Sequence, residues 1–440
     1  MNYFLIIWFG DLISTIGSGL TAFSLGAYAF QLTGKASSTA MILLLSFLPT
    51  FLFRPLGGVL ADRMNRPLLI FLSSIGSAIS IFSMYPFLIQ AKPELLYLYP
   101  GLIFGALFFS LQNPAYKAII SDLIPQELYS KASGLTQLSN AAQFLISPVL
   151  GGILMSYFSI STIILVDACS FLLCASSAFL IWMILKTNQK TVKAPKKRLN
   201  VMLELYEAWQ ALLANRAVFL LVCLVSVLLF YIGLIQALLT PMVLSFADIN
   251  QLGRAQSACA VGMLAASLMI SVVQRKQTNV TILIWSLFAM GICFSFIGMV
   301  ANIWAVIIPG FLFFVALPFA NSSIDVLIRS NIATEKQGRI WSLISAFTYL
   351  GSILAYGCAG FLSDKLFNPL LMSDGALASS LGKIFGIGPG RGIAVLFFIS
   401  GMLVVLLSII IARTVAIKKL EPKQDKEKNY FPDNEAVQTF

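Results

Sequence analysis

Two charged residues, Asp11 and Arg54, lie inside apolar runs near the start of the chain. A charged side chain within a membrane-spanning segment is energetically costly, so each is a functional candidate. With a helical rise of about 1.5 Å per residue, both lie ~10–12 Å from the same membrane boundary, where a carboxylate and a guanidinium can pair. We hypothesise that Asp11 takes up and releases a proton, while Arg54 favours its ionised form until the two separate. The alternatives are a static ion pair, a snorkelling arginine and a guanidinium that binds an anionic molecule.

Other polar residues lie at comparable depths in the apolar runs. Asp167 is a further proton-coupling candidate, with hydrogen bonding between helices as the alternative. Asp325 and Arg329 have the spacing that predicts a local ion pair on one helix face. The candidates for lining a substrate cavity are chosen by depth alone: Ser14, Ser18, Gln112, Asn113, Gln137, Asn140, Gln143, Tyr231, Gln236, Asn321 and Asp325. Hydrogen bonds between helices explain any one of them equally well.

The composition argues against catalytic chemistry. The chain has no histidine, which is the commonest general base and metal ligand. Its six cysteines all lie in apolar runs without a CxxC pair, which favours burial over a disulfide or a metal site. The glycine-rich segment 386–392 lacks the strand–loop–helix context and the ending of a phosphate-binding loop. We therefore expect no catalytic residue, no metal, no cofactor and no enzymatic activity.

The elements that must position these residues are membrane-spanning helices. Hydrophobic residues make up 58% of the 440 residues and charged residues 11%, whereas a soluble domain carries roughly 25% charged residues. Runs of roughly 20 apolar residues, the length that crosses a bilayer as a helix, recur along the chain. The expected spans are 3–31, 38–61, 67–90, 95–120, 131–157, 160–185, 216–246, 254–273, 278–300, 303–328, 338–364 and 392–416. The sequence predicts an all-α polytopic membrane protein with twelve transmembrane helices.

The placement of lysine and arginine predicts the orientation in the membrane. Most of them fall in the loops on one side, in the central linker and in the C-terminal tail, so both termini are expected in the cytoplasm. This explains the net charge of +11 without a nucleic-acid partner. The N-terminal run has no signal-peptide features and is predicted to stay as the first span. The expected parts are an N-terminal six-helix bundle (1–185), a basic cytoplasmic linker (186–215), a C-terminal six-helix bundle (216–417) and a charged cytoplasmic tail (418–440).

The two halves share a sequence pattern. Ile124-Pro125-Gln126-Glu127, followed by Lys131, aligns with Ile332-Ala333-Thr334-Glu335, followed by Arg339. The same offset carries Gly152 onto Gly360. Repeated bundles around a site near the membrane midplane are a common plan of secondary transporters, so we expect two pseudo-symmetric bundles.

The segment 57–67, between the second and third spans, resembles the signature loop of the major facilitator superfamily. The matching positions are Gly58, Asp62, Arg63 and Arg66. Asn65 stands where the family has glycine, and we expect it to adopt the left-handed backbone of such a turn. The resemblance implies a gating loop in which Asp62 meets the N-terminus of a helix in the opposite half, and Arg66 is expected to reach Asp122. The alternative is an ordinary positively charged cytoplasmic loop.

Other segments are similar to the macrolide-efflux-like branch of bacterial drug:proton antiporters. They are Gln112-Asn113-Pro114-Ala115, Ser121-Asp122-Leu123-Ile124-Pro125, Asp167-Ala168-Cys169-Ser170-Phe171 and the glycine-rich segment 386–392. The fifth span carries an antiporter-like motif: Ser147, Pro148, Gly151 and Gly152. Ser147 replaces the family's first glycine, and the alternative is a kinked packing face. Siderophore exporters look similar in the same places.

The resemblance implies a monomeric transporter that exports an amphipathic, drug-like or macrolide-like molecule across the bacterial inner membrane. It further implies proton antiport powered by the proton gradient, with rocker-switch alternating access. The expected partners are the lipid bilayer, a small-molecule substrate and protons. One alternative is a siderophore or metabolite transporter of the same fold. Another is a transport-inactive membrane sensor or scaffold.

Overall fold

The computed structural model describes residues 1–90, 93–125, 128–188, 210, 216–272, 277–331 and 337–414. Most of the predicted linker 186–215 and all of the predicted tail 418–440 lie outside these residues. So do the side chains of Asp62 and Arg329.

The first half of the chain forms six long helices. They are α1 (Asn2–Thr33), α2 (Ala36–Arg63), α3 (Arg66–Phe82), α5 (Tyr99–Leu123), α6 (Tyr129–Tyr157) and α7 (Ile160–Asn188). Two short elements, α4 (Tyr85–Leu88) and the 3₁₀-helix η1 (Leu95–Leu98), connect α3 to α5.

The second half repeats this plan. Its long helices are α9 (Arg216–Leu244), α10 (Ile249–Val272), α11 (Asn279–Phe296), α12 (Trp304–Ser330), α13 (Gln337–Phe361) and α16 (Arg391–Arg413). Between α13 and α16 lie the π-helical segment η4 (Leu362–Phe367), α14 (Asn368–Leu370) and α15 (Gly382–Phe385). The described residues therefore contain helices without β-strands, and the predicted all-α class is confirmed.

Ten of these helical segments are long and apolar enough to cross a membrane, among the residues that the structure describes. The two other long helices, α10 and α13, include residues whose side chains the structure does not describe (271–272 and 337–346), and the count does not extend to them. The first turns of α10 carry the polar residues Asn250, Gln251 and Arg254. The same residues explain why the sequence predicts a start at 254, whereas the helix begins at Ile249.

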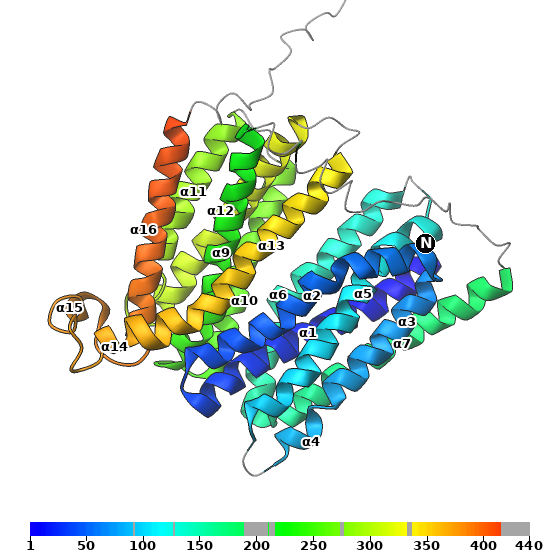
Figure 1. The fold of residues 1–440 in the computed structure, drawn as a ribbon, viewed down its shortest axis with the longest axis horizontal. Coiled ribbons are helices and arrows are strands. Elements are labelled where there is room, and N and C mark those ends of the chain that lie inside the picture. The colour runs from blue at the N-terminus through cyan, green and yellow to red at the C-terminus, as the bar shows by residue number, and fades with distance from the viewer. Residues whose placement is uncertain are drawn as a thin grey trace, which may run out of the picture.

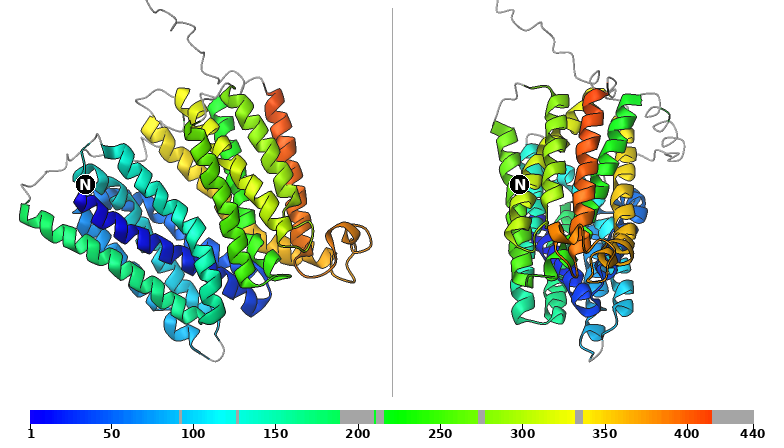
Figure 2. Two further views of the ribbon diagram at one scale, coloured as in Figure 1. Left: turned by 180° about the vertical axis from the view of Figure 1, so that it is seen from behind. Right: turned by 90° about the vertical axis from the view of Figure 1, so that its left-hand side faces the viewer.

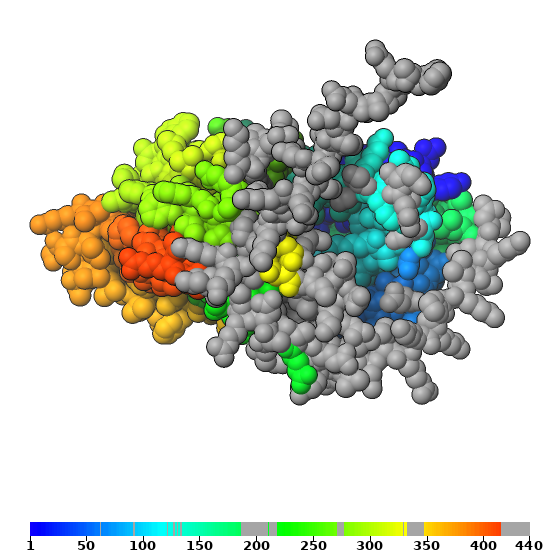
Figure 3. Space-filling model, turned by 90° about the horizontal axis from the view of Figure 1, so that it is seen from above, coloured from blue at the N-terminus to red at the C-terminus, as the bar shows by residue number. Residues whose placement is uncertain are grey.

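The helices form two bundles that approach each other at one end and diverge at the other (Figure 1). Helices α1 to α7 make the first bundle, and α9 to α16 make the second. The same divergence is visible from behind (Figure 2), and the N-terminus lies at the diverging end. Seen from above (Figure 3), the two halves of the chain occupy opposite sides of the molecule.

Arginines lie at the helix ends of one end of the molecule. The diverging end carries the start of α1, the end of α2 at Arg63, the start of α3 at Arg66 and the end of α16 at Arg413. We call it the basic face, and we call the other end the opposite face.

The apolar core is continuous between the bundles near the opposite face. Phe23 and Ala27 of α1 and Ala36 and Ala40 of α2 belong to the same buried cluster as the core of the second bundle. A separate cluster around Ile7 fills the first bundle toward the basic face. The halves therefore share a core at one end and have separate cores at the other.

Candidate functional site

Helices α6 and α10 form one side of the contact between the bundles. A Cβ atom on Gly152 of α6 would lie 2.9 Å from the carbonyl oxygen of Ile249 in α10, so only glycine allows this approach of the two backbones. The amide of Asn250 donates a hydrogen bond across the same contact to the Ser156 hydroxyl, at 2.8 Å.

The antiporter-like motif of α6 lies at this contact. A Cβ atom on Gly253 of α10 would collide with the carbonyl oxygen of Pro148. The Ser147 hydroxyl donates to the carbonyl oxygen of Ile16 in α1, at 2.8 Å. Gly151 faces α1 as well. The motif therefore joins α6 both to its own bundle and to the other one, which is the close packing that its small residues permit.

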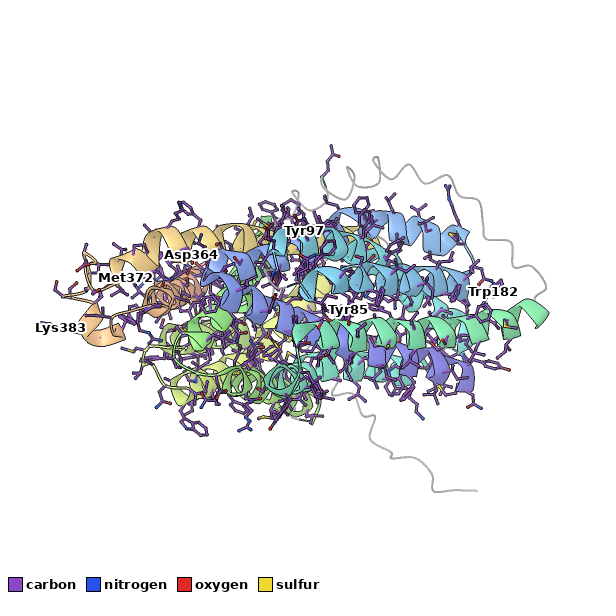
Figure 4. All side chains as sticks on the ribbon, turned by 90° about the horizontal axis from the view of Figure 1, so that it is seen from below. Tyr85, Tyr97, Trp182, Asp364, Met372 and Lys383 are labelled. Atoms are coloured by element: carbon purple, nitrogen blue, oxygen red, sulfur yellow. The ribbon has the colours of Figure 1, made fainter. Side chains whose placement is uncertain are left out.

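Helices α2 and α13 form the other side of the contact. Gly360 near the end of α13 packs directly on the backbone of Ser37. One turn later the Asp364 carboxylate accepts backbone N–H bonds from Ala36 at 3.1 Å and Ser37 at 2.8 Å. The residue before α2 is Lys35, whose side chain does not cap the helix. A carboxylate from the second bundle therefore caps the N-terminus of α2, and Figure 4 shows Asp364 where the two bundles meet.

The two sides of the contact follow the internal repeat. Gly152 and Gly360, which the repeat aligns, both pack against the first turns of a helix in the other bundle. The caps of those helices differ, because α10 is capped within its own bundle by Asp248, which accepts from the Gln251 N–H at 2.7 Å. Asp364 is a residue that sequence reasoning missed. Its position one turn after the repeat glycine was the available signal.

An aromatic cluster continues the α2–α13 contact toward the basic face. Phe47 lies 5.8 Å from Tyr349 and 5.6 Å from Tyr356, and Phe51 lies 6.5 Å from Tyr349, between ring centroids. We call these four residues the aromatic seam. The Tyr356 hydroxyl donates a hydrogen bond to the side-chain carbonyl of Gln236 in α9.

The predicted pairing of Asp11 with Arg54 is wrong. The Arg54 guanidinium lies over the Tyr349 ring, with its Cζ atom 5.2 Å from the centroid. Within the described residues the ion pair that forms is Arg66–Asp122, and neither Asp11 nor Arg54 takes part in one. The reason is the arrangement of the bundle. Helix α2 turns this side chain toward α13, and α1 packs mainly against α6 and α7.

Asp11 instead faces the interior of its own bundle. It is half-buried, and it lies close enough to Tyr116 of α5 and Cys174 of α7 to interact with both electrostatically. The preceding residue, Gly10, packs against α7 at Cys174. Both neighbours are uncharged side chains, and the buried Tyr116 hydroxyl has no hydrogen-bond partner in the described residues.

Asp167 is the more deeply buried acid, with 1% of its surface exposed. The Ser170 hydroxyl donates to one carboxyl oxygen at 3.2 Å, while Oδ2 has no hydrogen-bond partner in the described part of the chain. Gly17 of α1 leaves room for the carboxyl, and the Thr21 side chain faces it. An ionised carboxylate at such a site needs a cation or several donors, so this environment favours a protonated Asp167.

The gating loop is organised around Arg66. Its Nη1 atom lies 2.6 Å from Oδ1 of Asp122 and donates to the carbonyl oxygen of Ala118 at 2.9 Å. The predicted reach of Arg66 to Asp122 is present. Arg63 is exposed, and the side chain of Asp62 lies outside what the structure describes. The proposed contact of Asp62 with the other half stays a prediction.

One detail of this loop differs from the sequence prediction. Asn65 has a φ of −64°, which is not left-handed, and its side chain caps α3 by accepting from the Leu68 N–H at 3.3 Å. Pro67 lies in the first turn of α3, as proline favours. Gly57, rather than Gly58, makes the close packing on α5, because a Cβ on Gly58 would meet no atom within 4 Å.

The uncharged cavity candidates divide into exposed and buried residues. The exposed ones are Gln137, Asn140, Gln236 and Asn321, and Asn140 donates to Gln137 at 3.2 Å. Gln143 is half-buried and lies against Gly19 of α1. Exposed amides in the middle of membrane helices indicate water-accessible positions.

The remaining candidates are buried or half-buried. Ser14 and Gln112 are 4% and 3% exposed, and the Gln112 amide lies 3.5 Å from the Cys174 sulfur. Ser18 and Asn113 are half-buried and each has a buried oxygen without a partner in the described residues. The Tyr231 ring packs on Phe230 and Phe294 in the second bundle. Asp325 is half-buried, and its predicted pairing with Arg329 stays a prediction.

Comparison with known proteins gives a family and several relatives. The sequence profile of the Major Facilitator Superfamily matches residues 7–356. Macrolide efflux protein A of Streptococcus pyogenes is 24% identical over 443 residues, covering 96% of this chain and 98% of its own. Quinolone resistance protein NorA of Staphylococcus aureus (strain COL) is 22% identical over 375 residues, covering 84% and 92%.

Solved structures share the fold. The nucleoside transporter NupG has a TM-score of 0.72 at 11% identity and covers 94% of this chain and 100% of its own. A bacterial homologue of the iron transporter ferroportin, solved in an inward-facing state, has a TM-score of 0.71 at 14% identity and covers 94% and 99%.

Proposed function

The chain belongs to the Major Facilitator Superfamily, and on that premise we propose that it exports an amphipathic small molecule from a bacterial cytoplasm by proton antiport. It is a multi-pass membrane transporter and not an enzyme. The full-length relatives named for macrolide and quinolone efflux support export as the direction.

The observation that carries the proposal is the one-sided contact between the bundles. Gly152 against α10 and Asp364 against α2 hold the bundles together at the opposite face, and the helices diverge toward the basic face. A basic face belongs in the cytoplasm by the positive-inside rule. This conformation is therefore open to the cytoplasm, and a rocker-switch motion would close that side while parting the contacts at the other.

Proton coupling rests on Asp11 and Asp167, the two acids of the first bundle that lie within spans. In the cytoplasm-open conformation Asp167 has no cation within ion-pair distance among the described residues, and this favours a bound proton. In an antiport cycle the outward-open state takes up the proton. This cytoplasm-open conformation, with Asp167 protonated, would precede the release of the proton as substrate binds. Asp11, which is less buried, is the group from which a proton can leave toward the basic face.

Transport by purified protein in proteoliposomes tests this function. Erythromycin serves as the macrolide probe, and a pH gradient is imposed in either direction. We expect erythromycin movement that reverses with the gradient, and that both Asp11→Asn and Asp167→Asn abolish the dependence on it. Erythromycin movement that ignores the gradient would overturn antiport. A siderophore or metabolite moved in its place would favour the alternative substrate class, and no movement of any compound would favour a sensor.

A further inference from the structure

Arg54 carries a positive charge that no side chain neutralises within the described residues. It forms no ion pair and no hydrogen bond there, and its only polar contact is with the face of Tyr349. It stands nine residues before the end of α2 at Arg63, which places it roughly 13 Å inside the span at about 1.5 Å per residue. A guanidinium has five N–H donors, and an unpaired one at this depth indicates a functional site.

The groups around Arg54 are aromatic and come from both bundles. Tyr349 belongs to α13, and Phe51 and Phe47 lie one and two turns before Arg54 on α2. All three rings are half-buried, so they keep accessible surface. Together they offer an apolar, stackable surface beside one positive charge.

The position of this cluster makes it reachable from the basic face. Beyond Phe47 toward the opposite face, the seam is closed by Tyr356 and then by Gly360 against Ser37. Toward the basic face the bundles diverge (Figure 1). The exposed Gln236 amide of α9 is hydrogen-bonded to Tyr356 and adds a polar group at the level of that residue. A molecule that enters between the bundles would therefore meet Arg54 and the aromatic seam where the bundles converge.

We propose that Arg54 binds a carboxylate of the transported molecule, whose aromatic body packs on Phe47, Phe51 and Tyr349. This inference rests on the proposed function and adds aromatic or amphipathic carboxylates to the molecules that the protein would export. A guanidinium binds a carboxylate through two parallel hydrogen bonds, and a ring contact leaves donors available for them. One arginine suits a monoanion, and Asp11 and Asp167 face the interior of the first bundle, where they do not offset its charge.

The charge of the probe can be changed with little change in its shape. Norfloxacin carries an aromatic carboxylate, and its methyl ester lacks that anionic group while both keep the piperazine ammonium. Both are fluorescent and can be followed in proteoliposomes. The unaltered protein should move norfloxacin with a lower half-saturating concentration than the ester. Arg54→Gln should raise that concentration for norfloxacin at least about tenfold and leave the ester within about twofold. Arg54→Lys should give an intermediate half-saturating concentration for norfloxacin. Lysine keeps the positive charge but cannot form the two parallel hydrogen bonds of a guanidinium.

Arg413→Gln is the matched control, since it removes the same charge from an exposed position at the end of α16. Arg413→Gln should leave the half-saturating concentration of both probes unchanged. Tyr349→Phe should keep norfloxacin transport, whereas Tyr349→Leu should weaken the transport of both probes through loss of the ring.

Two results would overturn the inference. One is an unaltered protein that does not favour norfloxacin over the ester. The other is an Arg54→Gln variant that elutes as a folded monomer and loses the transport of both probes to the same extent. If erythromycin is still exported in either case, the proposed function stands and only the carboxylate site fails. If no compound moves, the proposed function itself fails.

Discussion

The carboxylate of Asp364, at the end of α13, caps α2 of the other bundle at the backbone N–H of Ser37, 2.8 Å away. Among the described residues of the first bundle none performs this task, since Lys35 precedes α2 and its side chain offers no acceptor. A motion that parts the bundles at the opposite face must therefore leave the N-terminus of α2 uncapped. The contact stabilises the conformation described here relative to any state that is open at that face.

Asp364→Asn should shift the protein toward the state open at the opposite face. An amide is a weaker acceptor and lacks the charge that favours a helix N-terminus, so we expect a change of about 1 kcal/mol, or roughly fivefold in the equilibrium. Spin labels at Tyr157 and Lys383, both exposed at that face, would report a larger fraction of long distances. Asp374→Asn, in an exposed turn, is the control. Unchanged distance distributions would show that the cap does not bias the two states.

Gly152→Ala should separate α6 from α10. The added methyl would lie 2.9 Å from the Ile249 carbonyl oxygen, which forces one backbone to move, and we expect a loss of stability of about 1–3 kcal/mol. Gly134→Ala on the same helix has open space for its methyl and should be neutral or slightly stabilising. Thermal unfolding in detergent compares the two. Equal melting temperatures of the two variants would mean that the close approach of α6 and α10 does not contribute to stability.

Asp167→Asn should fold as well as the unaltered protein while losing the response to pH gradients. Asparagine matches the neutral carboxylic acid in shape. Among the described residues the site holds no cation, so the loss of a negative charge would leave no positive charge unpaired. We expect a thermal midpoint that is unchanged or raised, together with erythromycin movement that no longer follows the pH gradient. A strongly destabilised Asn variant would indicate instead that Asp167 is ionised and held by a partner.

The Arg66–Asp122 pair should contribute little to stability by itself. Both side chains are partly exposed, at 27% and 46%, and exposed ion pairs contribute about 0.2–1 kcal/mol. A double-mutant cycle with Arg66→Gln and Asp122→Asn should give a coupling energy in that range, falling as salt is added. Arg66→Gln should have the larger single effect, because it also loses the bond to the Ala118 carbonyl. A coupling energy well above this range would point to a buried network in the loop.

The sequence by itself determined the twelve spans, the family and the packing role of the glycine motif in α6. Each of these depends on residues that are close together in the sequence. The length of an apolar run decides whether a helix crosses a membrane, and a glycine marks where backbones approach. The structure places Gly152 and Gly360, which the repeat aligns, at two places where the bundles touch.

Only the tertiary structure decided which charged groups meet. Asp11 and Arg54 stand at equal depth on consecutive helices, yet one faces Tyr116 and the other Tyr349, because depth fixes height in the membrane and not the direction in which a helix face points. Asp364 and Ser37 are far apart in the chain, and their bond exists only where the two bundles converge. Such contacts depend on the rotation and packing of whole helices, which the sequence of one helix does not encode.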